Sequence, residues 1–186
     1  MQKASTVFFL FLTLLINSKG FTQNNQPEKK ENPVFPVFNL DELNAFEPGK
    51  KLSEIPKKFG DGENLKLQRS LEIKKFNLVH EAYVFPIWVQ YYNEIIIDYY
   101  TRLPSYFLHD TFHQSLLNRY GNQNIYALKD STAVYTWENQ KSKRIYSGGC
   151  TITCYPIYYA VINKTPGKIP TIYRPLADLF VSTGFD

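Results

Sequence analysis

The chain has 186 residues and a formal charge of +4 at pH 7, with 21 Lys and Arg against 17 Asp and Glu. Its basic residues are scattered in doublets such as Lys57–Lys58 and Lys74–Lys75, so the sequence excludes the positive stripe expected of a nucleic-acid-binding protein. The length suits one domain after removal of a leader, and 14 Tyr and 14 Phe supply ample apolar mass for one core.

The N-terminus has the pattern of a signal peptide. Lys3 gives it a positive start, and the uncharged apolar run 7–16 is about half the ~20 residues that span a bilayer. Small residues after this run predict a leader over 1–22, cleaved before Phe21 or before Gln23. We therefore expect an exported protein, periplasmic or extracellular, with no transmembrane span in the mature chain. An uncleaved N-terminal anchor is the alternative.

The mature chain is predicted to begin with a tether over 23–40, polar at first and then extended by its prolines. Residues 41–186 are predicted to form a single domain. Hydrophobic periodicity and turn signals predict its elements, including a tight turn at Tyr92–Asn93 that pairs two of its strands as a hairpin. In chain order these are a helix at 51–59, strands at 71–79, 82–92 and 94–103, a helix at 106–120, strand-like pieces at 125–128, 133–137, 144–146, 151–153 and 155–162, and a last helical turn at 176–181.

This order of elements predicts an α+β fold, with a predominantly antiparallel sheet and two short-to-medium helices packed on one face. Each predicted helix ends in an aromatic residue and a glycine, Phe59–Gly60 and Tyr120–Gly121, and an Asn follows at a similar offset in both. The match is consistent with a worn duplication of a helix-plus-meander unit. Shared helix-stop chemistry explains it equally well.

Two histidines on the helix at 106–120 are the main candidates for chemistry. His109 and His113 are four residues apart, on one helical face, a spacing that can chelate a metal such as zinc. Both also fall within the apolar stripe, which favours two packed histidines with hydrogen bonds; a pH-sensitive packing role is the third interpretation. A zinc site needs a third ligand. The candidates for it are Glu138, His80 and Glu81.

Two cysteines form the second candidate site. In an oxidising compartment Cys150 and Cys154 are first interpreted as a disulfide. A straight strand would separate their Cα atoms by roughly 13 Å, too far for a bond, so a turn or bulge must lie between them. Two free thiols, or a metal site completed by His109 or His113, are the alternatives.

Three tyrosine doublets form the third candidate site. Neighbouring residues on a strand point to opposite faces, so each doublet gives one ring to the core and one to the other face. An outer face of tyrosines would bind a glycan or a peptide strand, whereas ordinary cross-strand aromatic pairing is the simpler interpretation. The six residues are Tyr91, Tyr92, Tyr99, Tyr100, Tyr158 and Tyr159.

The sequence has no nucleophile elbow, phosphate-binding loop or dinucleotide fingerprint. We therefore expect a non-enzymatic binding protein without a cofactor, which recognises a protein or glycan partner at the cell envelope. An inhibitor or immunity-type protein has the same sequence features. The alternative is a small metal-dependent hydrolase that uses His109 and His113, with zinc as its cofactor.

Overall fold

The structure is a computed structural model. It describes residues 38–66, 71–80, 83–103, 109–129, 132–149, 157–165 and 170–183. The predicted signal peptide, most of the predicted tether, and both Cys150 and Cys154 lie outside these ranges, so the expectations for them stay predictions.

The described part of the chain forms eight strands, two α-helices and three 3-10 helices. The strands are β1 (Glu63–Leu65), β2 (Glu72–His80), β3 (Tyr83–Tyr92), β4 (Ile95–Arg102), β5 (Ile125–Lys129), β6 (Thr132–Glu138), β7 (Ser142–Gly149) and β8 (Tyr158–Asn163); the α-helices are α1 (His109–Tyr120) and α2 (Leu176–Thr183); the 3-10 helices are η1 (Leu43–Phe46), η2 (Leu52–Glu54) and η3 (Lys57–Phe59).

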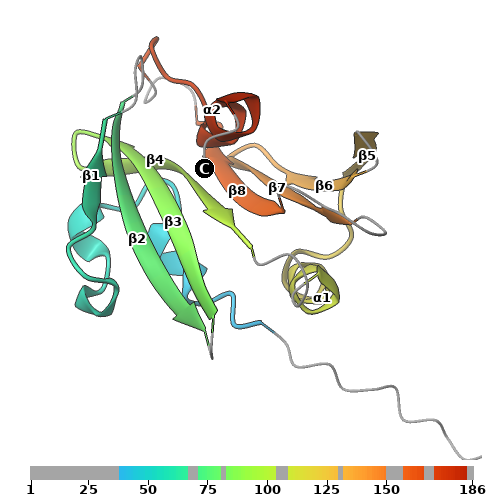
Figure 1. The fold of residues 1–186 in the computed structure, drawn as a ribbon. Helices are drawn as coiled ribbons and strands as arrows, with labels where there is room; N and C mark the ends of the chain where they lie inside the picture. Colours follow the sequence, from blue (N-terminus) through green and yellow to red (C-terminus); the bar gives the residue numbers. More distant parts are fainter. Residues whose placement is uncertain are drawn as a thin grey trace, which may run out of the picture. The chain divides into compact units, whose positions relative to one another are not determined.

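All eight strands belong to one antiparallel sheet, ordered β1-β2-β3-β4-β8-β7-β6-β5 (Figure 1). The chain builds it as two four-stranded meanders, β1–β4 and β5–β8, which meet where β4 pairs with β8. In this central pair Asp98 lies opposite Ile162 and Arg102 lies opposite Tyr158. The predicted antiparallel sheet is confirmed.

The predicted hairpin between β3 and β4 is also confirmed. Its turn residues are Asn93 and Glu94, one position later than predicted, and both have positive φ angles, 48° and 61°. Two left-handed residues give a turn whose twist matches that of the flanking strands. Asn tolerates this conformation well, which is why the turn forms here.

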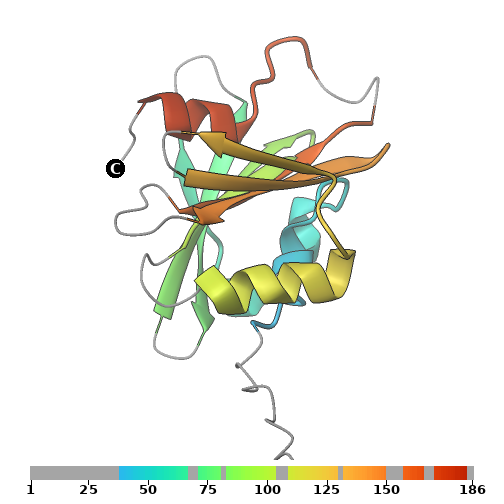
Figure 2. The ribbon, with the colours of Figure 1, turned by 90° about the vertical axis from the view of Figure 1, so that its right-hand side faces the viewer.

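The two α-helices lie on opposite faces of the sheet (Figure 2). Phe112 and Leu116 of α1 belong to the same buried cluster as Tyr99 of β4. Leu176 and Phe180 of α2 belong to a second cluster, with the next residue of β4, Tyr100. Because neighbours on a strand point to opposite faces, these clusters are two separate cores.

The predicted fold class is therefore wrong. The described chain is a single large sheet with few helices, and its two α-helices do not share a face. The predicted first helix at 51–59 is only η2 and η3, interrupted at Pro56. Proline offers no N–H to a helix and forces the preceding Ile55 into extended backbone, so no α-helix forms. Both meanders follow a helical segment, but only α1 before β5–β8 is an α-helix, so the described chain does not have two α-helices that each precede a meander.

Aromatic rings fill the larger core, as the composition indicates. Phe46 contacts Phe59, Phe76 and Tyr99 with ring centroids 5.0–6.4 Å apart. Phe38, near the end of the predicted tether, is buried in the same cluster, and its N–H donates to Ser115 Oγ at 2.9 Å. Neither helix of the described chain is long and apolar enough to span a membrane.

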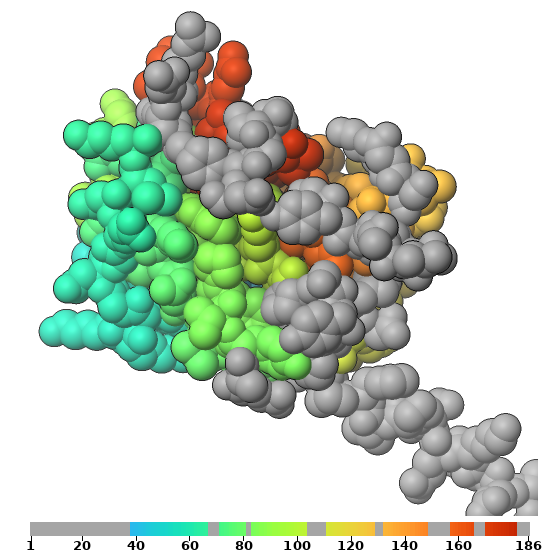
Figure 3. Space-filling model, in the orientation of Figure 1, coloured from blue at the N-terminus to red at the C-terminus, as the bar shows by residue number. Residues whose placement is uncertain are grey.

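The two edges of the sheet differ. β1 is a three-residue strand at one edge, and the space-filling view shows its side chains beside those of β2 and β3 (Figure 3). β5 at the other edge exposes Ile125, Tyr126 and Leu128 to solvent. Short edge strands limit pairing with other chains, so β1 is the better protected edge.

Candidate functional site

A β-bulge in β4 positions a cleft of the described chain. Gln90 of β3 lies opposite Asp98, and the next residue, Tyr91, lies opposite Ile96, so Ile97 is the extra residue. A bulge bends its strand and turns the flanking side chains. As a result Ile96 points to the same core as Tyr99, although the two are three residues apart.

At the bulge β4 also changes the segment that it pairs with on the side away from β3. Beyond it, residues 98–102 pair with β8. Before it, Ile96 pairs instead with the segment after η1: the Gly49 N–H donates to the Ile96 carbonyl at 2.8 Å, and the Ile96 N–H donates to the Lys50 carbonyl at 2.9 Å. The segment at 47–50 and the end of β8 thus pair with different parts of β4. A cleft of about 850 Å³ lies between these two segments.

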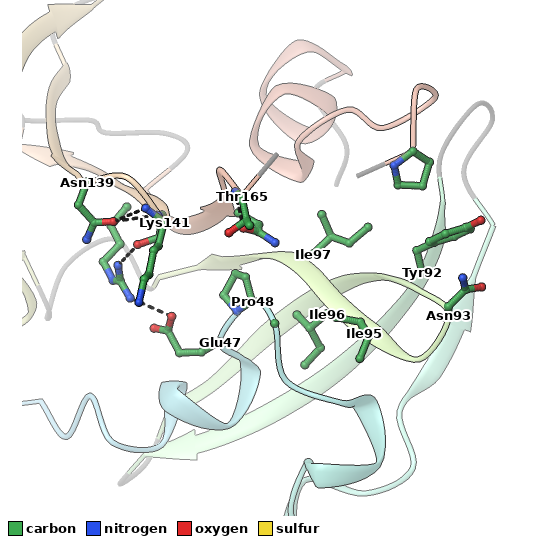
Figure 4. A pocket seen from close by; sticks show the side chains of 15 residues that line it. Glu47, Pro48, Tyr92, Asn93, Ile95, Ile96, Ile97, Asn139, Lys141 and Thr165 are labelled. Carbon is green, nitrogen blue, oxygen red and sulfur yellow. Dashed lines mark hydrogen bonds and ion pairs between the residues drawn. The ribbon is translucent and has the colours of Figure 1, made fainter. Parts of the chain in front are cut away.

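Figure 4 shows the residues around this cleft. Its apolar part comes from the bulge and from the two prolines at its sides. Its polar part comes from the β6–β7 turn, the start of β7 and the end of β8. The lining residues are Glu47, Pro48, Gly49, Tyr92, Asn93, Ile95, Ile96, Ile97, Asn139, Lys141, Ser142, Arg144, Asn163, Thr165 and Pro170.

An ion pair connects the two walls of the cleft. Arg144 Nη2 donates to Glu47 Oε2 at 2.8 Å, across 97 positions in sequence, and the two side chains are only 13% and 20% exposed. Arg144 also donates to Ser142 Oγ, and its guanidinium lies 4.6 Å from the centre of the Tyr120 ring. Burial lowers the pKa of Arg144, but its contacts with Tyr159, Glu47 and Tyr120 outweigh this effect and raise it, so the side chain stays charged.

Buried hydroxyl groups lie next to this ion pair. Tyr99 and Tyr159 are each 1% exposed, and their ring centroids lie 6.0 Å apart. The charge of Glu47 raises the pKa of both hydroxyls, and the charge of Arg144 lowers it. Burial raises the pKa of both tyrosines well above the ordinary value, so the hydroxyls stay protonated. Arg144 thus lines the cleft as a charged group, and the two neutral phenols belong to the core.

The polar rim of the cleft is held by its own hydrogen bonds. Asn139 Oδ1 accepts the N–H groups of Lys141 and Ser142 at 2.8 and 2.9 Å, which fixes the β6–β7 turn. After β8, Asn163 Oδ1 accepts the Thr165 N–H at 2.8 Å. Side-chain hydrogen bonds of this kind replace a regular turn.

The structure places His113 among aromatic rings. Its ring centroid lies 4.1 Å from that of Tyr135 and 5.9 Å from that of Tyr146. His109 lies on α1, and its side chain is outside the described part. Among the described residues no three His, Cys, Asp or Glu side chains are grouped to hold a metal ion. The zinc pair stays a prediction.

The candidates for a third metal ligand are used elsewhere. Glu138 is paired with Lys164, and the His80 ring packs against Phe38, with the two centroids 4.6 Å apart. Glu81 lies outside the described ranges. The environment of these residues therefore gives the metal hypothesis no further argument.

The tyrosine doublets are divided between the two cores. Tyr99 and Tyr159 face α1, whereas Tyr100 stacks on Tyr158 at 5.2 Å on the side of α2. Tyr91 is buried as well, and burial, together with a hydrogen bond to Glu72, raises its pKa to about 12. Tyr92, at 46% exposure, is the most exposed of the six, and it lies at the cleft.

Sequence reasoning missed the residues that define this site, above all Glu47, Ile97 and Arg144. Arg144 follows Lys141 and Lys143 in a basic run, so the local sequence does not distinguish it from surface charges. Glu47 and Ile97 carry no local signal, because their roles depend on pairings distant in sequence.

The chain was also compared with known proteins. No protein family, no curated protein and no solved structure matches it. The site's geometry therefore carries the functional argument alone.

Proposed function

We propose that this protein is a non-enzymatic binding protein of the cell envelope or the extracellular space, which holds its ligand in the cleft at the β4 bulge. The observation that supports it best is the cleft itself. A concave site with an apolar floor and a few fixed polar groups is the usual form of a small-molecule site. The three isoleucines Ile95, Ile96 and Ile97 supply the floor, and the rim at Asn139 and Asn163 supplies the fixed polar groups.

The proposed export rests on the predicted leader over 1–22. Its test is expression of the full chain, followed by mass spectrometry of the exported material. A mature N-terminus at Phe21 or Gln23 is the expected result. A chain that keeps its first residues and stays with the cytosolic fraction would contradict export.

The proposed binding is tested by protein-observed NMR of the mature chain with a library of small soluble compounds. We expect hits that shift the amide signals of Ile95–Ile97 and of Asn163. Tyr92→Ala at the mouth of the cleft should weaken these hits about fivefold or more. Tyr126→Ala is the matched control, because Tyr126 is similarly exposed but lies on β5 and does not line the cleft.

Two results would contradict the proposal. Hits that map away from the cleft, or that Tyr126→Ala weakens as much as Tyr92→Ala, would remove the cleft from the argument. Turnover of ester, peptide or glycosidic substrates by the purified chain would show an enzyme instead.

A further inference from the structure

The strand β5 forms one edge of the sheet (Figure 1). It pairs with β6 over all five of its residues, and with no other strand of the described chain. In an antiparallel ladder a strand directs its N–H and C=O groups alternately to its two sides, so the outer side of β5 presents backbone groups to which no described strand pairs. Such an edge is a template for a strand from another chain.

The side chains along this edge are apolar and exposed. Ile125 is 49% exposed, Tyr126 58% and Leu128 68%, and Ala127 between them is exposed as well. Proteins usually protect an edge with a very short strand, a proline, a bulge or a charge. The opposite edge is protected in this way, because β1 has three residues and begins with Glu63. β5 is longer, pairs with β6 without a bulge, and has its one charged residue at its end.

The sequence of β5 is complementary to itself. Two strands related by a two-fold axis perpendicular to the sheet run antiparallel, as all neighbouring strands of this sheet do. A two-fold axis at Ala127 pairs all five residues of each copy. Tyr126 then lies opposite Leu128 of the second copy, and these two residues share a face because they are two positions apart. Lys129 lies opposite Ile125, so no like charges oppose each other.

The ring of Tyr126 is already held in place for such a contact. It packs on Tyr135 of β6 with the centroids 5.5 Å apart, and Tyr135 stacks on Tyr146 of β7 at 6.0 Å. Tyr146 belongs to the core beneath α1. Tyr126 is thus the exposed end of a row of packed rings, and a ring that is already ordered loses little conformational freedom when a second chain packs on it.

We propose that β5 is a homodimer interface, at which two copies of this protein pair their β5 strands about Ala127 and join their sheets into one. A second copy is the partner that the observations favour, because the apolar side chains of the strand match those of the same strand turned around. Five residue pairs make a small interface, so the dimer exchanges with the monomer. No residue of β5 lines the cleft at the β4 bulge, so this inference does not depend on the proposed ligand site.

The first test is sedimentation velocity of the mature protein over a wide range of concentrations. We expect a dimer whose fraction grows with concentration. Leu128→Lys should raise its Kd about tenfold or more, because edge lysines oppose strand pairing and the two new charges lie diagonally across the axis. Val79→Lys should leave the Kd unchanged. It is the matched control, because Val79 is 63% exposed but belongs to β2, near the opposite edge of the sheet.

The second test is a disulfide that only the proposed register allows. Residues directly opposite in an antiparallel pair have Cα atoms about 4.5–5.5 Å apart, within reach of a disulfide, so Ala127→Cys should form a covalent dimer. Ile125→Cys is the matched control, because its two copies lie four strand positions apart, roughly 13 Å. Mass spectrometry of tryptic peptides locates the bond, so that bonds of the native Cys150 and Cys154 are not mistaken for it.

A chain that stays monomeric at every concentration would overturn the inference. So would a dimer that Leu128→Lys weakens no more than Val79→Lys does, or a bond that Ile125→Cys forms as readily as Ala127→Cys. A monomer in which an added extended peptide of unrelated sequence shifts the NMR signals of β5 would show that this edge accepts the strand of another protein. That result would also overturn the second copy as the partner.

Discussion

Asp98 Oδ2 accepts the backbone N–H of Leu176 at 2.8 Å, so a central strand of the sheet caps the N-terminus of α2. The same oxygen accepts the Tyr173 hydroxyl at 3.0 Å. We assign the Gln90 amide so that its nitrogen donates to Asp98 Oδ1 at 3.1 Å and to the Arg174 carbonyl at 3.0 Å. One buried carboxyl group thus attaches the C-terminal segment to the sheet.

We expect Asp98→Ala to lower the free energy of unfolding by about 2–4 kcal/mol, because it leaves the Leu176 N–H and the Tyr173 hydroxyl without their acceptor. Urea unfolding of the two proteins measures this difference. Asp61→Asn is the control, since Asp61 is exposed on the turn before β1, and its effect should stay within about 0.5 kcal/mol. A loss for Asp98→Ala as small as that of the control would show that the carboxyl group does not hold α2.

Asp98 should also make the stability of the protein depend on pH. Burial raises the pKa of its carboxyl group to about 8, although the hydrogen bonds from Leu176 and Tyr173 oppose the rise. Since the folded pKa lies above the unfolded value of about 3.9, the unfolded chain releases this proton first as the pH rises. The stability that the protonated Asp98 carboxyl group contributes is complete below about pH 4, and it is lost as the pH rises to about 8.

The measurement is the free energy of unfolding at pH 5 and pH 8.5, for the wild type and for Asp98→Asn. The wild type should lose more stability between these two pH values than the variant, in which the residue no longer titrates. Equal losses in both proteins would show that Asp98 is ionised throughout this range.

The sequence was sufficient for the local elements of the sheet. The strands of the β3–β4 hairpin follow from alternation of apolar residues and from a turn at Asn93, and α1 ends at Gly121 as predicted. The Gly121 N–H donates to the Leu117 carbonyl at 2.9 Å, with φ of +73°, which is the left-handed stop that glycine favours. These features depend on neighbours in sequence, so a single sequence contains them.

The cleft depends on contacts that no local pattern contains. β4 pairs with β8 about 60 positions later, and the exchange of partners at Ile97 arises only when β8 and the segment at 47–50 both meet β4. The position of α2 was equally hidden, because its face of the sheet is set by the distant residue Asp98. The sequence shows Asp98 as a single acidic residue after an apolar run, but it does not show that Tyr173 and Leu176 donate to it.

Gly62 offers a test of close packing. A Cβ at Gly62 would lie 2.7 Å from a ring carbon of Phe76, and its φ is +72°. Gly121 has nearly the same φ, but a Cβ there would meet only open space. We expect Gly121→Ala to cost about 1–2 kcal/mol from backbone strain alone, and Gly62→Ala to cost at least about 1 kcal/mol more. Thermal unfolding of the two variants measures this difference in stability. Equal losses of stability would show that the Phe76 ring moves aside at no cost.

The Glu47–Arg144 pair should contribute more to stability than an exposed ion pair, because both of its side chains are largely removed from water. A double-mutant cycle with Glu47→Gln and Arg144→Met should give a coupling free energy of about 1–3 kcal/mol. The matched cycle uses Glu42→Gln and Lys58→Met, since Lys58 is 57% exposed, and should give about 0.2–1 kcal/mol.

Salt separates the two cycles further. Raising the ionic strength to about 1 M shortens the Debye length to about 3 Å and should remove most of the Glu42–Lys58 coupling, while the partly buried pair keeps most of its own. Equal couplings that fall together with salt would show that the partial burial of Glu47 and Arg144 does not strengthen their ion pair.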